Sequence, residues 1–218
     1  MDDGPGPVYG GDPQRTGGAL ADQESAYDVF VDFIQGGLAQ VAFCSAPALW
    51  VVATVPTYTT EVATAAMVAI LWLSLSLTAL RGGHLSVGRP WPALTNRRFG
   101  TTGWRAFLTR GAYLSATLLL VVSTGVLAQL IAGTYLANVA VALVGSTVAL
   151  WLLPVLSTAE PRVRLARFVY CLLGVCIAGF GVFALAPDPG ALVALAVILG
   201  LAMLDARPAG ALRALGDR

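Results

Sequence analysis

The stretch from Arg81 to Arg110, RGGHLSVGRPWPALTNRRFGTTGWRAFLTR, lies between two long apolar runs and carries six arginines but no acidic residue. Basic residues resist translocation across a bilayer, so an arginine-rich segment between apolar runs is typical of a cytoplasmic connection in a membrane protein. This stretch therefore predicts both the class of the protein and its orientation, and it gives a reference point for the segments on either side.

The composition of the 218 residues agrees with a membrane protein. Hydrophobic residues make up 57% of the chain and charged residues only 11%, whereas a soluble domain carries about 25% charged residues. So few charges cannot cover a water-facing surface, which excludes an ordinary soluble domain. All 13 basic residues are arginine, and Ala, Gly, Val and Leu are abundant. This usage favours a GC-rich, prokaryotic genome.

Six apolar runs have about the length of a membrane-spanning helix, which needs about 20 residues with a range of roughly 17–25. We expect these spans at 37–55, 62–80, 111–132, 135–156, 168–186 and 190–205. The sixth run is the shortest. The first contains Pro47, which predicts a kink inside that span. The expected fold is all-α, a polytopic membrane protein in which residues 25–218 form a single bundle of about six transmembrane helices.

The connections between these runs alternate in charge. The turns at 56–61, 133–134 and 187–190 contain no basic residue. The other connections and the C-terminal segment are basic, and beyond Arg110 their arginines are Arg162, Arg164, Arg167, Arg207, Arg213 and Arg218. Six spans place every basic segment on one side, which predicts a multi-pass protein of the cell membrane with both termini in the cytoplasm. The first span then also serves as the insertion signal.

The segment before the first span changes character near Ser25. Residues 1–24 are rich in Gly, Pro and Asp, and this composition predicts a disordered acidic tail. From Ser25, a possible helix cap, apolar residues recur with helical spacing, which predicts an amphipathic interfacial helix. Its apolar positions are Tyr27, Phe30, Val31 and Ile34. The pair Gly36–Gly37 is the expected bend between this helix and the span.

Three polar residues fall at membrane depth: Gln40, Gln129 and Asn138. Gln129 and Asn138 flank the turn at Gly133, so they are placed to form a hydrogen bond across the hairpin between the third and fourth spans. Such a bond holds helices together with about 0.6 kcal/mol, at most about 2. Alternatively, the two residues form a polar constriction open to the outside. Gln40 lies near the inner side, either in a vestibule or at the headgroups.

The arginine-rich stretch itself has two interpretations. Residues 102–110 have the pattern of an interfacial helix that leads into the third span, with Trp104 at headgroup depth. The arginines act either only as a topology determinant or as contacts for anionic lipid headgroups on the cytoplasmic side, at about 1 kcal/mol each. These candidate contacts are Arg81, Arg89, Arg97, Arg98, Arg105 and Arg110. A protein partner or a second copy of the chain is an alternative ligand, whereas nucleic acid is not expected because the charge is too sparse.

Residue types that carry catalysis are scarce. No Asp or Glu occurs between Glu61 and Glu160, no expected span has a carboxylate near its middle, and His84 is the one histidine. We therefore expect no catalytic, cofactor or metal site. The three cysteines lie in apolar runs and are interpreted as small apolar side chains. They are Cys44, Cys171 and Cys176.

These patterns favour a multi-pass membrane protein without catalytic activity, in a structural or accessory role. The alternative is a small-solute transporter or channel-like protein, which requires Gln40, Gln129 and Asn138 to converge with the kink at Pro47. A second alternative is a membrane enzyme that acts on lipids at the inner headgroups. That enzyme would require His84, Arg89, Arg97 and Arg98 to gather in one pocket.

Overall fold

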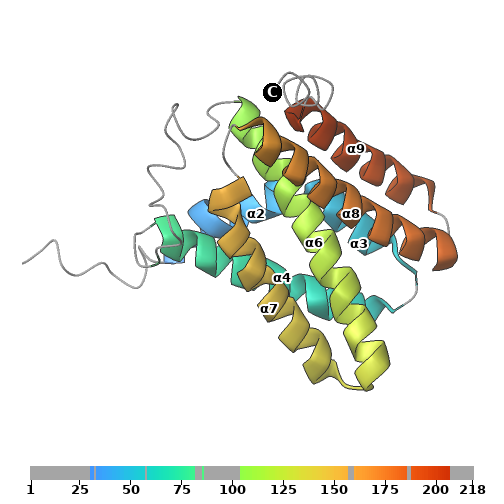
Figure 1. Ribbon diagram of the computed structural model, residues 1–218. Coiled ribbons are helices and arrows are strands. Elements are labelled where there is room, and N and C mark those ends of the chain that lie inside the picture. The colour runs from blue at the N-terminus through green and yellow to red at the C-terminus, as the bar shows by residue number, and fades with distance from the viewer. Residues whose placement is uncertain are drawn as a thin grey trace, which may run out of the picture.

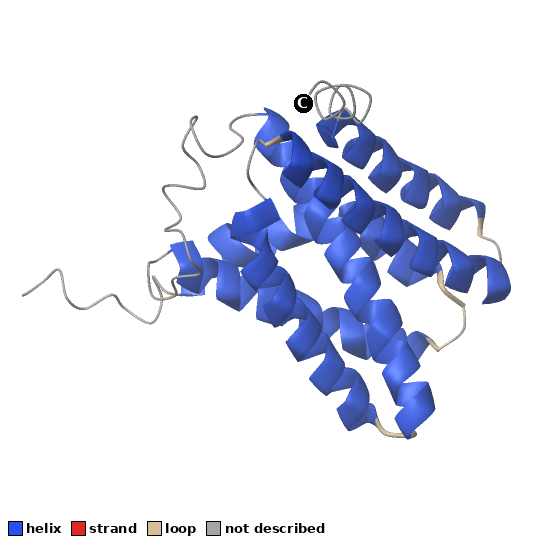
Figure 2. Cartoon of the chain, in the orientation of Figure 1, coloured by secondary structure: helices blue, strands red, loops and turns tan. Residues whose placement is uncertain are grey.

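The computed structural model describes residues 30–31, 33–56, 58–81, 85, 104–156, 160–185 and 188–206. All regular structure in these residues is helical, as Figure 2 shows. Five of the helices are long and apolar enough to cross a membrane, and a bent pair of shorter helices makes a sixth if it counts as one span. The expected all-α, multi-span fold is thus confirmed.

The second, fourth and sixth predicted spans match helices to within three residues at each end, whereas the helices over the third and fifth begin seven residues earlier than predicted. The helix Tyr135–Leu156 has the predicted bounds of the fourth span, and the helix Pro189–Ala206 extends the predicted sixth span by one residue at each end. In chain order the elements are η1 (Phe33–Leu38), α2 (Ala39–Cys44), α3 (Ala46–Thr54), α4 (Thr59–Arg81), α6 (Trp104–Ala132), α7 (Tyr135–Leu156), α8 (Pro161–Leu185) and α9 (Pro189–Ala206).

Helix α6 is the centre of the bundle. It contacts α4 and α7 on one side and α8 and α9 on the other (Figure 1). Every residue from 111 to 119 of α6 is buried, and small residues there allow close approach. A side chain at Gly174 of α8 would place its Cβ 3.0 Å from the carbonyl oxygen of Ala116, so these two helices touch through their backbones.

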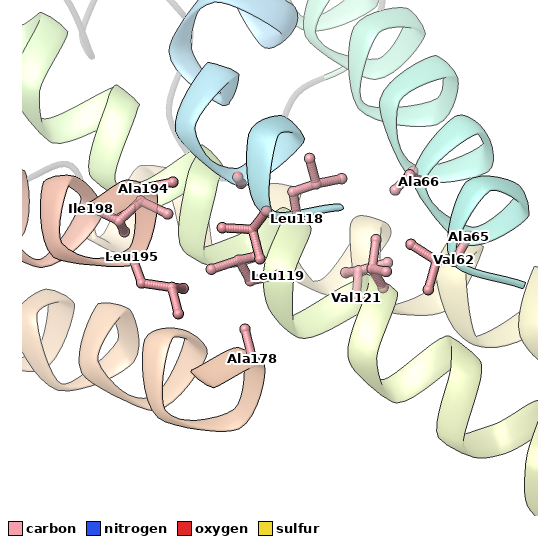
Figure 3. Packing of buried hydrophobic residues seen from close by; sticks show 14 of the residues in the cluster. Val62, Ala65, Ala66, Leu118, Leu119, Val121, Ala178, Ala194, Leu195 and Ile198 are labelled. Atoms are coloured by element: carbon pink, nitrogen blue, oxygen red, sulfur yellow. The ribbon is translucent and has the colours of Figure 1, made fainter. Parts of the chain in front are cut away.

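The hydrophobic core extends across α6 from one helix pair to the other. In Figure 3, Leu118, Leu119 and Val121 of α6 lie between side chains of α4 and side chains of α8 and α9. The partners on α4 are small, including Ala65 and Ala66, and both are buried. These small side chains let the helices pack closely, and close packing is a main source of stability where lipid surrounds the bundle.

The helix that precedes α4 is broken. The axes of Phe33–Cys44 and Ala46–Thr54 differ by 63°, so the predicted kink is confirmed, and it lies at Ser45. Pro47 occupies the first turn of α3, where its missing N–H removes no helical hydrogen bond. The Ser45 hydroxyl donates to the carbonyl of Val41 at 2.6 Å, and the Ser115 hydroxyl of α6 donates to the carbonyl of Cys44 at 3.1 Å.

The two parts of the broken helix reach opposite ends of the bundle. At one end, the guanidinium of Arg81, the last residue of α4, donates from Nη1 to the carbonyl of Gly36 at 2.7 Å. At the other, the indole Nε1 of Trp50 lies 2.9 Å from the position of a Cβ on Gly190, at the start of α9. The break lets one segment pack on α4 through η1 and on α9 through α3.

The predicted bend at Gly36–Gly37 is wrong. Both glycines lie inside the π-helical turn η1, which packs against α4. A Cβ on Gly37 would collide with the carbonyl oxygen of Ser74 and the hydroxyl of Thr78. Gly37 is therefore required for close helix packing and not for a change of direction. The predicted cap at Ser25 and the tail at 1–24 lie outside the described residues.

Two basic segments that were expected outside the spans are helical. Residues 104–110 form the first turns of α6 without a break before the apolar part, so no separate interfacial helix is present there. Arg162, Arg164 and Arg167 lie in the first two turns of α8, not in a connection. Pro161 opens this helix with a fixed φ that suits a helix start, and the Arg164 N–H already bonds to the carbonyl of Glu160.

Candidate functional site

Two polar clusters lie at opposite ends of α6. The first, here the amide cluster, comprises Gln129, Asn138 and the backbone carbonyl of Glu61. The second, here the arginine cluster, comprises Thr109, Arg167, Asp205 and the backbone carbonyl of Leu156. Thr109 and Gln129 are 20 positions apart on α6, so about 30 Å separates the two clusters along the helix.

The amide cluster joins three helices. The Asn138 side chain is fully buried, and its Nδ2 donates both to Gln129 Oε1 at 2.9 Å and to the Glu61 carbonyl at 2.9 Å. The predicted hydrogen bond between Gln129 and Asn138 is therefore present, and it gains a third member from α4. The turn between α6 and α7 closes at Gly133, whose φ of +69° is in the left-handed region that suits glycine.

Space for the Asn138 amide comes from a glycine on α6. A Cβ on Gly125 would lie 2.5 Å from Asn138 Oδ1, so any larger residue displaces the amide. The two amide side chains in the cluster are neutral and cannot act as an acid or a base. Their arrangement holds helices together, which is the ordinary role of buried amides between membrane helices.

Gln40 does not join the amide cluster. It lies in α2 next to η1, and η1 packs on α4 near Ser74, whereas Asn138 binds α4 at Glu61. Thirteen positions of helix separate these two points of α4, about 20 Å. The three polar residues singled out in the sequence therefore do not converge on one site. A vestibule at the inner side, one of the two alternatives for Gln40, would also include its neighbours in sequence Gln35 and Asp32. Gln35 is exposed, and Asp32 lies outside the described residues.

The arginine cluster contains a buried ion pair. The Arg167 Nε–H donates to Asp205 Oδ2 at 2.5 Å, and the two side chains are only 2% and 5% exposed. The Thr109 hydroxyl donates to Asp205 Oδ1 at 2.6 Å, and Arg167 Nη1 donates to the Leu156 carbonyl. The cluster thus connects four helices, and each charge is paired, as burial demands.

The sequence reasoning did not find this cluster, because it assigned Arg167 to a connection and treated Asp205 as the end of the last span. Two signals were available. Arg167 follows the helix start at Pro161 by nearly two turns, so it is already inside α8. Asp205 is the one acid in α9, and an acid inside a membrane helix needs a partner at the same depth.

Hydroxyl groups form further hydrogen bonds in the two turns of α6 that follow Thr109. Tyr113 donates to the carbonyl of Ala149 on α7, and the Thr117 hydroxyl shares a 2.9 Å hydrogen bond with Tyr170 of α8. The rings of Tyr113 and Tyr170 stack with their centroids 5.3 Å apart. After Thr117 the side chains from Leu118 to Val122 are apolar, so these contacts end before the amide cluster.

The predicted lipid-contacting arginines fall into three groups. Arg81 is exposed at the end of α4, and Arg110 is half-buried at the same end of the bundle. Arg105 lies in the first turns of α6. Arg89, Arg97, Arg98 and also His84 lie outside the described residues. Lipid binding at these positions stays a prediction.

The groove between α8 and α9 is apolar. It has a volume of about 360 Å³ and is lined by Val175, Cys176, Gly179, Phe180, Leu192, Leu195, Ala196 and Leu199. It offers no charged or hydroxyl group for binding a polar solute. Within the described residues, no three His, Cys, Asp or Glu side chains are grouped so as to hold a metal ion.

No curated protein and no solved structure matches the chain. A family model matches residues 24–160, more than half of the chain. The matched region runs through α7 and contains the amide cluster, Thr109 and Leu156, whereas Arg167 and Asp205 follow it. The protein, a multi-span helical membrane protein, therefore belongs to the family described as Domain of unknown function (DUF8215).

Proposed function

We propose that the protein is a non-enzymatic structural or accessory component of the cell membrane. One observation carries this proposal: the polar side chains inside the bundle bind one another in small local sets. Gln129 binds Asn138, and Arg167 binds Asp205, at opposite ends of α6. Bonds of this kind suit a scaffold, because they fix neighbouring helices in place.

A transport function is the second candidate, and the broken helix favours it. Many transporters use broken helices whose free carbonyls bind substrate or ions near the middle of the membrane. At Ser45, however, two of the carbonyls on the break have donors. Val41 O accepts the Ser45 N–H and hydroxyl, and Cys44 O accepts the Ser115 hydroxyl. This bonding supports a permanent kink more than an ion site.

A reconstitution experiment separates these functions. The full chain is placed in liposomes and measured for ionic conductance, for osmotic swelling in small neutral solutes and for turnover of labelled phospholipids. The accessory role predicts rates equal to those of protein-free liposomes in all three measurements. A conductance or solute flux that depends on the protein would establish transport instead, and lipid turnover would establish the enzyme.

The proposed orientation has both termini in the cytoplasm. The distribution of the arginines supports it: Arg81, Arg110, Arg162, Arg164 and Arg167 share one end of the bundle, together with the acids Glu160 and Asp205. The described charged residues at the other end are Glu61 and Asp188. The basic end faces the cytoplasm under the positive-inside rule.

Accessibility labelling tests this orientation with a matched pair of exposed positions. In a chain whose cysteines are replaced by alanine, Glu160→Cys marks the basic end and Thr134→Cys marks the opposite end. On intact cells, a membrane-impermeant maleimide is expected to label position 134 and not position 160. Labelling of position 160 on intact cells would show that the orientation is the opposite of the one proposed.

A further inference from the structure

The ion pair between Arg167 and Asp205 is only half formed. An arginine presents its Nε–H and one Nη2–H along the same edge of the guanidinium, and this edge matches the two oxygens of a carboxylate in a pair of parallel hydrogen bonds. Here Nε reaches Asp205 Oδ2 at 2.5 Å, but Nη2 is buried without a hydrogen-bond acceptor among the described residues. A buried N–H without an acceptor is costly, so it needs an explanation.

The explanation lies in the other partners of the two side chains. Asp205 Oδ1, the oxygen that would complete the pair, accepts the Thr109 hydroxyl of α6 at 2.6 Å. The Arg167 guanidinium is in turn held through Nη1 by the Leu156 carbonyl of α7. Each member of the ion pair is therefore bonded to a different third helix. A carboxylate oxygen can accept two hydrogen bonds, so these outside bonds oppose the second hydrogen bond of the pair by holding the two groups in an orientation in which Nη2 has no acceptor.

We propose that the last turn of α9 has two positions and that Thr109 determines which of them is occupied. We call this arrangement the latch. In the position seen here, Asp205 is shared between Thr109 and a single N–H of Arg167. In the second position, Asp205 releases Thr109 and accepts both Nε–H and Nη2–H, so α9 is bound more firmly to α8 and is no longer tied to α6. The latch concerns the mobility of α9 and does not depend on the accessory role.

The accessibility of the Cys171 thiol reports on the position of the last turn of α9. Cys171 lies one turn after Arg167 on α8, is fully buried, and its Sγ lies 3.5 Å from the Ala112 carbonyl of α6. It belongs to a small apolar cluster with Ala112, Ala116 and Ala202. Because Ala202 is on α9, one turn before Asp205, movement of the last turn of α9 away from α8 and α6 uncovers the thiol.

The test measures how fast N-ethylmaleimide labels Cys171 in detergent-solubilised protein that carries Cys44→Ala and Cys176→Ala. Thr109→Val removes the hydroxyl but keeps the shape of the side chain. The latch predicts labelling about threefold to tenfold slower in this variant, because Arg167 gains a second charge-assisted bond to Asp205. Thr109→Ser keeps the hydroxyl and is expected to label at the parent rate. Asp205→Asn is expected to label at least about tenfold faster, since it weakens the pair.

The direction in which Thr109→Val changes the labelling rate of Cys171 tests the latch. If Thr109 merely adds one more bond to a cluster with a single position, its loss speeds labelling, and faster or unchanged labelling overturns the latch. A parallel protein with Cys44→Ala and Cys171→Ala retains only the exposed Cys176. Its labelling rate is expected to be the same with and without Thr109→Val, which shows that the effect at Cys171 does not come from a general change in the packing of the helices.

Discussion

The two ends of α6 use different chemistry to hold the bundle together. At one end, neutral amides join Gln129 and Asn138, which are only nine positions apart in the chain. At the other, charges join Arg167 to Asp205 across 38 positions, and Thr109 to Asp205 across 96. Each cluster also contains one contact between helices that are distant in sequence, since Asn138 binds the Glu61 carbonyl of α4 across 77 positions. The two clusters therefore differ mainly in charge: the first is neutral, and the second contains a buried ion pair.

The two chemistries also differ in what happens when one partner is removed. Loss of a hydrogen bond between membrane helices costs about 0.6 kcal/mol on average and at most about 1.7. Loss of one partner of a buried ion pair leaves an uncompensated charge and costs about 3–5 kcal/mol. The arginine cluster is therefore the more sensitive end of α6, although the pair as a whole need not add more stability than an apolar contact.

The largest effect is expected from Arg167→Leu, which leaves the carboxylate of Asp205 buried without its cation. The free energy of unfolding should fall by about 3–5 kcal/mol. Denaturation in mixed detergent micelles, followed by circular dichroism, measures this loss. The double variant with Asp205→Leu removes both charges and is expected to recover most of it. A single variant that loses less than the double variant would contradict this account of the pair.

An intermediate effect is expected from Gly125→Ala, which forces a Cβ against the Asn138 amide. The loss should be about 1–3 kcal/mol, as for an overpacked core. It should shrink strongly in an Asn138→Ala background, where the amide is absent. Gly200→Ala is the matched control, because a Cβ there meets no atom within 4 Å. That variant is expected to be neutral or more stable by up to about 1 kcal/mol.

The smallest effect is expected from Gln129→Leu. Asn138 loses one acceptor but keeps the Glu61 carbonyl, so the cost should be about 0.6 kcal/mol and not more than about 1.7. The same denaturation assay measures it. A loss as large as that of Arg167→Leu would show that the two ends of α6 do not differ in the way described.

Local features of this fold are predictable from the sequence. The fourth span at 135–156 is found at its full length, because its apolar run is bounded by a glycine turn and a basic segment. The contact between Gln129 and Asn138 follows from the same turn, since residues that flank a tight hairpin must face each other. Pro47 signals the kink, although the break falls two positions earlier, where Ser45 can bond to the carbonyl of Val41.

Contacts between distant helices are not predictable in this way. Arg167 and Asp205 lie about equally far from the turn between α8 and α9, so this hairpin brings them to the same depth. Nothing in their spacing, however, indicates that Thr109 of α6 joins them. The role of Gly37 was missed for a similar reason: its neighbours Ser74 and Thr78 belong to another helix. The sequence by itself indicates which residues share a face of each helix. Which of these faces pack together depends on how all six segments are arranged.

The broken helix has a consequence for the order of biosynthesis. Its second half, α3, packs against α9, and Trp50 contacts a helix whose first residues are made about 140 positions later. At a synthesis rate of about 5–20 residues per second, α3 emerges roughly 7 to 28 s before its partner. The packing of α3, which is made before α4, is thus completed only after α9 is made. Truncation before α9 should leave α3 open to neighbouring proteins or to quality control.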